Sequence, residues 1–185
     1  MNLPTTPSFS LKNKRALIAG ASSGIGLACA VALAEYGAFV TIAARRSQKL
    51  EELCISLKSR GISPEFVELD VSKTDRTIEI INQLDPFDIL VNSAGIAKHS
   101  LALETKETDF DDVISVNFKG AYFLTMAVAK RLILAKKSGS LINISSQMGL
   151  VGGQERAVYS ATKHAVEGFT KSMAIELGGS NIRVN

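Results

Sequence analysis

The sequence is poor in cysteine, with only Cys29 and Cys54 among its 185 residues. These two residues do not form a Cys-x-x-Cys pair, and they do not stand near histidines at the spacing of metal ligands. The sequence therefore predicts neither a disulfide framework nor a metal site. Both cysteines lie in apolar helical patterns, so we expect them to be small core residues in a reducing compartment.

Long apolar runs and dense clusters of basic residues are also missing. No apolar run approaches 18 residues, and the first residues lack the basic start and apolar run of a secretory signal. The net charge is +3, and the basic residues are dispersed apart from short pairs, which excludes the footprint of a nucleic-acid-binding protein. There is no internal repeat or low-complexity segment. We expect a cytoplasmic protein that binds neither membranes nor nucleic acid.

The residues that are present suit one globular domain, with 46% hydrophobic and 21% charged side chains. Strand-like and helix-like segments alternate along the chain. Strands are expected at 15–20, 38–44, 65–69, 87–92, 140–145 and 182–185, and helices at 24–37, 47–61, 72–84, about 107–135 and 156–177. Several strands are continuous apolar runs, the pattern of strands buried on both faces. This order predicts an α/β, Rossmann-like, doubly wound parallel sheet in a single domain, residues 11–185, after a tail, residues 1–10.

A glycine-rich turn, "AGASSGIG", follows the first expected strand. Glycines there permit positive φ and close approach of an anion, and the helix that follows directs its free N–H groups and positive dipole end at the turn. We expect the turn to bind the phosphates of a dinucleotide; the alternative is a tight turn without a ligand. The candidate residues of this turn are Gly20, Ser22, Ser23, Gly24, Ile25 and Gly26.

The spacing Gly-x-x-x-Gly-x-Gly, together with "VYSATKHAVEGF" at residues 158–169, resembles the short-chain dehydrogenase/reductase family. In the latter stretch Tyr159 and Lys163 stand four residues apart, on one face of the expected helix. The resemblance extends from about Leu11 to Asn185. One departure is Ala19, where the family usually has threonine.

The end of the second strand, "TIAARRSQ", bears on the choice of cofactor. In dinucleotide-binding folds a carboxylate at this point binds the ribose 2′-hydroxyl of NAD, and a basic residue accommodates the 2′-phosphate of NADP. Here Ala44 stands in place of an acid, and Arg45 and Arg46 follow it. Arginine suits a phosphate monoester, so we expect NADP, with NAD less favoured. Many NADP-dependent relatives have another basic residue where this chain has Ser23.

Two further segments resemble cofactor-binding motifs of the family. By that resemblance Asp70 binds the adenine amino group and the backbone N–H of Val71 contacts the ring, although Asp70 also fits a simple turn residue. The segment "VNSAG" resembles the family's Asn-Asn-Ala-Gly motif, which implies that Asn92, Ala94 and Gly95 lie near the cofactor ribose.

The resemblance also implies a catalytic tetrad of Asn117, Ser146, Tyr159 and Lys163, which matches the family in order and spacing. Ser146 precedes Tyr159 by thirteen residues, the family's spacing, which selects it over Ser145. Asn117 falls in the middle of an expected helix, where asparagine is unfavourable. In the family an asparagine there holds a water; the alternative is an exposed helix residue.

The implied reaction is hydride transfer between NADP(H) and a ketone or secondary alcohol, of the carbonyl, sugar or 3-oxoacyl type. A free phenol titrates near pH 10, so Tyr159 as acid/base requires the neighbouring Lys163 and the oxidised nicotinamide to favour phenolate. Ser146 would donate to the substrate oxygen. The alternatives are a non-catalytic NADP-binding sensor or scaffold, and a sugar-nucleotide epimerase or dehydratase. By resemblance we also expect a homodimer or homotetramer.

Some residues near the expected site match no motif. His99, His164 and Glu155 are predicted to be loop or helix-surface residues, and Gln147 and Met148 to line the substrate pocket. The last residues, "NIRVN", look like the start of a further strand, whereas relatives continue by roughly a third. We therefore expect the sequence to be a piece of a longer protein, which by itself would be poorly soluble and nearly inactive.

Overall fold

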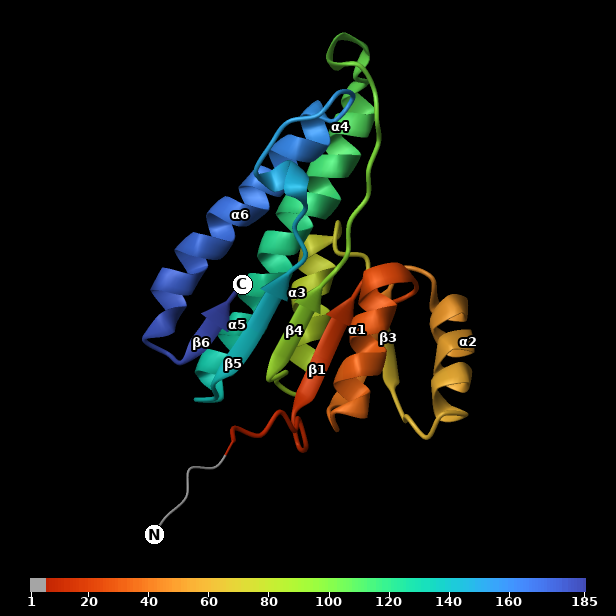
Figure 1. Cartoon of the computed structure of the whole chain (residues 1–185), viewed down its shortest axis with the longest axis vertical. Coiled ribbons are helices and arrows are strands. Elements are labelled where there is room, and N and C mark those ends of the chain that lie inside the picture. Colours follow the sequence, from red (N-terminus) through yellow and green to blue (C-terminus); the bar gives the residue numbers. More distant parts are fainter. Residues whose placement is uncertain (1–5) are drawn as a thin grey trace.

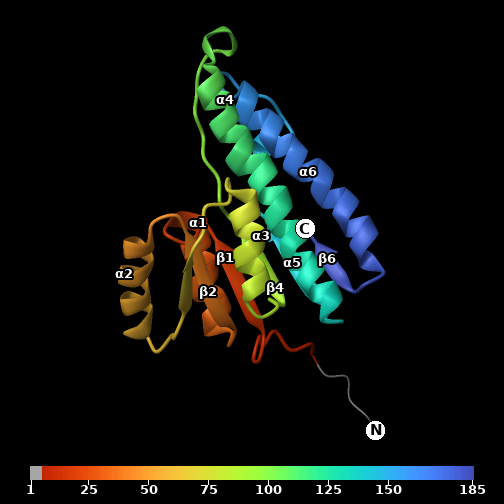
Figure 2. The ribbon, with the colours of Figure 1, turned by 180° about the vertical axis from the view of Figure 1, so that it is seen from behind.

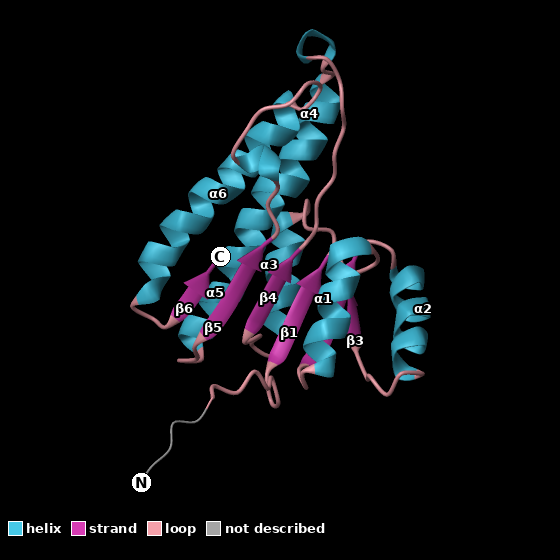
Figure 3. Cartoon of the chain, viewed as in Figure 1, coloured by secondary structure: helices cyan, strands magenta, loops and turns pink. Residues whose placement is uncertain are grey.

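A computed structural model describes residues 6–185 and contains a six-stranded, all-parallel sheet in the order β3-β2-β1-β4-β5-β6. Its strands are β1 (Arg15–Ala19), β2 (Phe39–Ala44), β3 (Glu65–Glu68), β4 (Ile89–Asn92), β5 (Gly139–Asn143) and β6 (Ile182–Val184). The chain starts in the middle of the sheet, winds outward to β3, crosses to β4 and winds outward again to β6 (Figure 3). This confirms the predicted doubly wound parallel sheet, and it places the reversal of winding between β1 and β4.

Helices cover the two faces of the sheet. They are α1 (Gly24–Glu35), α2 (Ser47–Lys58), α3 (Thr74–Gln83), α4 (Glu107–Ile114), α5 (Ala121–Leu134) and α6 (Ala157–Gly178), with short turns η1 (Ala102–Glu104) and η3 (Gln147–Gly149). The helices α1 and α2 cover one face, and α3, α5 and α6 the other (Figures 1 and 2). Strand β1 shows the division. Ala16 and Ile18 belong to the core between the sheet and helices α1 and α2, and Leu17 and Ala19 belong to the core on the other face. Alternation of side chains along a strand produces these two cores.

The helix expected at about 107–135 differs from the prediction in its middle. Between α4 and α5 lies a π-helical segment, η2 (Ser115–Gly120). A Cβ on Gly120 would lie 2.7 Å from the backbone oxygen of Val71, so the glycine lets η2 approach the end of the third strand. The π geometry is a feature that helix periodicity does not predict, and such segments concentrate at functional sites.

Glycines stand just after α1 and α2, and the start of α3 differs from the expected one. Gly37 and Gly61 have positive φ (96° and 78°) just after α1 and α2 and accept the left-handed backbone that closes a helix. The third helix, expected to begin at residue 72, begins at Thr74 after Lys73, so Ser72 precedes it. The hydroxyl of Ser72 instead donates to Asp70 Oδ1 (2.8 Å).

Residues 1–5 of the predicted tail lie outside the described part, and residues 6–10 form neither helix nor strand. The chain joins the domain at Leu11, whose N–H donates to the carbonyl of Tyr36 (2.8 Å). Between residues 6 and 185, the structure contains no helix with the length and hydropathy needed to cross a membrane.

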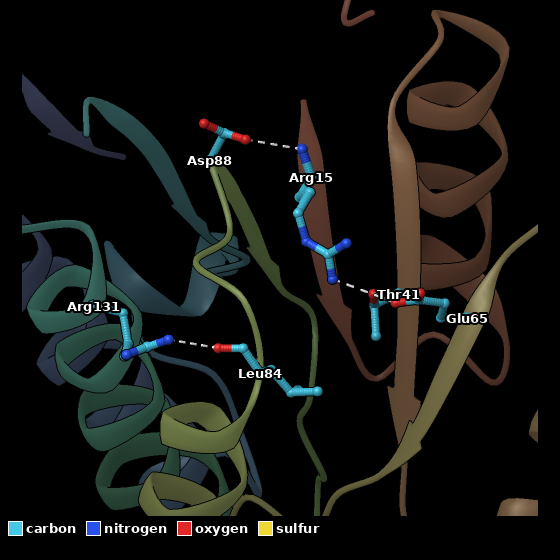
Figure 4. A network of polar contacts seen from close by, with 6 residues as sticks. All are labelled: Arg15, Thr41, Glu65, Leu84, Asp88 and Arg131. Carbon is cyan, nitrogen blue, oxygen red and sulfur yellow. Dashed lines mark hydrogen bonds and ion pairs between the residues drawn. The ribbon is translucent and has the colours of Figure 1, made fainter. Parts of the chain in front are cut away.

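A polar network holds the amino-terminal ends of the strands together (Figure 4). The backbone N–H of Arg15 donates to Asp88 (2.9 Å), and its guanidinium lies 3.4 Å from the carboxylate of Glu65. The guanidinium of Arg131 donates to the carbonyl of Leu84 (2.8 Å). These charged residues serve the fold at the edge of the sheet opposite to the one where the predicted site residues gather.

Candidate active site

A cleft of about 300 Å³ lies at the carboxyl ends of the strands, where the winding of the sheet reverses. Open parallel sheets bind ligands at this edge. Most of the predicted cofactor residues lie here. The cleft is lined by Gly20, Ser22, Ser23, Ile25, Ala44, Arg45, Arg46, Leu69, Asp70, Val71, Ser93, Ala94, Gly95, Ile96 and Val116.

The glycines of the turn have different roles in the structure. Gly20 has φ of 78°, and a Cβ on it would lie 2.7 Å from backbone atoms of Ser93 and Ala94. A Cβ on Gly26 would lie 2.4 Å from the backbone oxygen of Gly20, and Gly24 has φ of 57° with open space around it. Gly20 and Gly26 are therefore required by packing of backbone against backbone. Gly20 and Gly24 have the positive φ that was predicted, and of the three glycines only Gly20 lines the cleft; phosphate binding by the turn stays a prediction.

The end of the cleft at β2 carries positive charge. Arg45 and Arg46 are exposed, and within residues 6–185 neither guanidinium makes an ion pair. Asp70 stands opposite on the next strand end, where its Oδ1 accepts from the backbone N–H and the hydroxyl of Ser72 (3.0 and 2.8 Å). One oxygen of Asp70 therefore closes a turn, and the residue also lines the cleft, while its contact with adenine stays a prediction.

A second pocket, of about 250 Å³, continues the cleft toward α6. It shares Ile25, Ser93, Gly95 and Ile96 with the first and adds Ala97, Ile144, Ser145, Tyr159 and Lys163. The side chain of Ile25 is 59% exposed although it is apolar, at the point where the two pockets meet. The two pockets thus form one long groove from Arg45 and Arg46, just after β2, to Tyr159 on α6.

Tyr159 and Lys163 lie together in this second pocket, as their spacing predicts. Lys163 Nζ is 5.8 Å from the centroid of the Tyr159 ring and donates to the carbonyl of Ile144 (2.7 Å). Lys163 is only 6% exposed. Burial lowers the pKa of this ammonium group from its ordinary value, because leaving water disfavours the charged form.

The lowered pKa of Lys163 predicts how stability depends on pH. At a pH between the lowered pKa of the folded state and the ordinary pKa of the unfolded state, the unfolded chain binds more protons than the folded one. The contribution of Lys163 to the free energy of unfolding therefore rises with pH in this range. We expect the stability of the wild type relative to Lys163→Met to increase as the pH approaches the ordinary lysine range. Chemical denaturation at about pH 7 and about pH 10 measures it; a difference independent of pH would contradict the expectation.

Asn117 is 1% exposed and lies within η2. Its Oδ1 accepts from the N–H of Ile96 and its Nδ2 donates to the carbonyl of Ile96, both at 2.8 Å. Nδ2 also lies 3.3 Å from the hydroxyl of Thr162, one turn from Tyr159. The interpretation of Asn117 as an exposed helix residue is therefore wrong: its amide joins the segment after β4 to η2 and α6.

Ser145 and Ser146, which follow β5, differ in their hydrogen bonds and in their contact with the pocket. Ser145 lines the pocket beside Tyr159, and its buried hydroxyl has no hydrogen-bond partner among the described residues. The Oγ of Ser146 accepts from the N–H of Met148 (3.1 Å), which leaves its own proton free to donate. Neither Gln147 nor Met148, predicted to line the substrate pocket, belongs to its lining in the described part of the chain.

Asn92 is 3% exposed and does not line the groove. Its Nδ2 donates to Asn143 Oδ1 (3.2 Å), which also accepts from the hydroxyl of Thr125 (3.0 Å).

Two residues near Tyr159 were not predicted to belong to the site. No pattern in the sequence indicated Thr162, because its hydrogen-bond partner Asn117 is distant in the chain. His99, expected to be a loop or helix-surface residue that matches no motif, lies against Tyr159, with nearly perpendicular rings and centroids 6.3 Å apart.

Known proteins share both this sequence and this fold. Residues 14–185 match the family described as short chain dehydrogenase. The chain is 38% identical to an uncharacterized oxidoreductase, YgcW, of Escherichia coli, covering 96% of this chain and 69% of that protein. It is 38% identical to the 3-oxoacyl-[acyl-carrier-protein] reductase FabG of Staphylococcus epidermidis, covering 94% and 72%. A solved gluconate 5-dehydrogenase from Burkholderia cenocepacia, in complex with NADP and tartrate, superimposes with a TM-score of 0.91 at 32% identity, covering 96% and 71%.

The sheet order and the groove at its reversal point are those of a doubly wound α/β fold of the dinucleotide-binding type. The chain belongs to the short-chain dehydrogenase/reductase family.

Proposed function

We propose that the protein transfers a hydride between NADP(H) and a ketone or secondary alcohol, with Tyr159 as general acid/base. The observation that supports this most directly is the continuity of the groove. The pocket that holds Tyr159 and the buried Lys163 shares four lining residues with the cleft at the glycine turn. A ligand that spans both would bring one end to the Tyr159 ring.

The donor set of the groove fits a phosphorylated dinucleotide. The amino end of α1, with Ser22 and Ser23 beside it, offers unpaired N–H groups and hydroxyls to phosphates. Arg45 and Arg46 suit a 2′-phosphate, and solved relatives include one with bound NADP. When bound, the cofactor supplies or accepts the hydride. In the proposal, Lys163 holds the nicotinamide ribose and Asp70 the adenine.

The chain's own residues handle the proton and the substrate oxygen. Tyr159 donates its proton to the carbonyl oxygen during reduction and takes it back during oxidation. The ammonium of Lys163, on the same helical face 5.8 Å from the ring, would stabilise the negative charge that develops on the Tyr159 oxygen as the proton leaves it. Ser146, whose hydroxyl proton is free, donates to the substrate oxygen. Asn117 holds the segment after β4 in place and would order a water that returns the proton to solvent.

A spectrophotometric assay tests the proposal. NADPH oxidation at 340 nm is followed with ketoses, diketones and 3-oxoacyl thioesters, and cofactor binding is measured in parallel by calorimetry. We expect oxidation of NADPH with at least one ketone class. Tight NADPH binding without turnover on any member of the panel would favour a non-catalytic sensor or scaffold. Absence of NADPH binding would contradict the proposal altogether.

Arg45 and Arg46, just after β2, predict that the protein binds NADPH more tightly than NADH. Replacing Arg45 by aspartate removes a charge-assisted contact to the 2′-phosphate, so NADPH should bind about 10- to 100-fold more weakly. NADH binding should change little, because NADH lacks that phosphate. The matched control is Arg60→Asp, an equal charge change at an exposed position just after α2. A wild type that prefers NADH, or an Arg45 variant that weakens both cofactors alike, would refute the assignment.

A further inference from the structure

The segment between β4 and η1 carries His99, whose side chain the proposed reaction does not use. The segment leaves the end of β4 and runs toward α4 (Figure 1). Its first residues line the groove, with Ser93, Gly95, Ile96 and Ala97 in the pocket that contains Tyr159. His99 follows two residues later and is exposed, yet its ring lies nearly perpendicular to the Tyr159 ring, with an interplanar angle of 80° and centroids 6.3 Å apart.

Contacts on both sides hold His99 in this position. Before it, both backbone polar groups of Ile96 bond to the Asn117 side chain at 2.8 Å. The ammonium of Lys98 lies 2.6 Å from the carboxylates of Asp109 and Asp112 on α4. After it, a hydrogen bond of 3.0 Å joins the hydroxyls of Ser100 and Thr105. A side chain anchored through its neighbours is preorganised for recognition.

The chemistry of the pocket leaves His99 a distinct role. Lys98 is neutralised by its two carboxylates, and Lys163 Nζ bonds the carbonyl of Ile144. The lining beside Tyr159 includes the apolar side chains of Ile25, Ile96, Ala97 and Ile144. Within residues 6–185 the ring nitrogens of His99 make no hydrogen bond with another residue. An imidazole nitrogen is thus available beside the phenol that binds the reacting carbonyl.

We propose that His99 is a specificity-determining residue that hydrogen-bonds an oxygen-bearing group next to the reacting carbonyl, which favours hydroxy ketones or keto acids over plain ketones. The inference rests on the proposed function, because it takes Tyr159 as the group that binds the carbonyl oxygen. A substrate held there has a substituent on either side of its carbonyl carbon. A substituent directed toward the side of Tyr159 where His99 lies meets the imidazole.

Matched ketones and a matched variant test this role. 1-Hydroxy-2-butanone and 3-pentanone differ by a hydroxyl in place of a methyl group, and 2-oxobutanoate supplies a carboxylate. We expect the wild type to have the higher kcat/KM for the oxygenated ketones. His99→Phe, which keeps an aromatic ring against Tyr159, should reduce that preference by about three- to tenfold, the effect of one hydrogen bond. His99→Gln, which keeps a donor, should restore part of it. The two oxygenated ketones show whether hydroxyl or carboxylate is preferred.

Two results would overturn the proposal. One is an equal loss of kcat/KM for all three ketones in His99→Phe, which would indicate a structural role. The other is an unchanged preference in that variant.

A binding measurement separates this inference from the proposed reaction. The chain has two histidines, so a long-range ¹H–¹⁵N spectrum of the imidazoles contains two spin systems, and His164→Phe assigns them. With NADP⁺ present, 1-hydroxy-2-butanone or 2-oxobutanoate should shift the His99 signals and 3-pentanone should not. His99 shifts without turnover would contradict the proposed reaction alone. Turnover without selective His99 shifts would contradict this inference alone.

Discussion

Tyr159→Phe is expected to lower kcat by about 10²- to 10⁴-fold while NADPH binding stays near that of the wild type. The substitution removes only the hydroxyl, the group that transfers the proton, and general acid–base catalysis has this magnitude. The ring remains, so its packing against His99 and its position near Lys163 are kept. Stopped-flow or steady-state NADPH oxidation measures the rate, and calorimetry measures the cofactor affinity.

Tyr36→Phe is the matched control for this prediction. Tyr36 is exposed just after α1 and belongs to neither pocket of the groove, and its recorded hydrogen bonds use only backbone atoms. Its variant should retain wild-type turnover. Near-normal turnover in Tyr159→Phe would remove Tyr159 as the acid/base and turn attention to the other groups in its pocket.

Lys163→Ala is expected to damage both steps, with NADPH bound about 10- to 100-fold more weakly and kcat lowered by about 10²-fold or more. The residue has two roles in the proposal: it contacts the cofactor ribose, and it stabilises the negative charge that develops on the Tyr159 oxygen during proton transfer. Its loss also leaves the Ile144 carbonyl without its ammonium partner. Binding calorimetry and the turnover assay report the two effects separately.

Two controls distinguish loss of function from loss of fold. Lys163→Met keeps most of the volume of the buried side chain, so it should melt close to the wild type yet show the same functional losses. Lys171→Ala removes an exposed lysine from the same helix and should leave both measurements unchanged. A Lys163→Met protein that keeps wild-type turnover and NADPH affinity would be incompatible with either role.

The sequence by itself determined the features that depend on neighbouring residues. The apolar run at Arg15–Ala19 becomes the central strand β1, because residues on both of its faces are buried. Tyr159 and Lys163 share a pocket because residues four apart on a helix lie on one face. The order of strands and helices was also readable, since right-handed crossovers leave few arrangements for alternating elements.

Only the tertiary structure decided which distant residues meet. The π-helical turn that buries Asn117 exists where Gly120 packs on the backbone of Val71, a contact between segments about fifty residues apart. The contact of His99 with Tyr159 joins residues sixty positions apart. Helical and strand periodicity constrains side chains only within a few turns. Contacts between the segments that follow different strands arise only when the parallel sheet brings those strand ends to one edge.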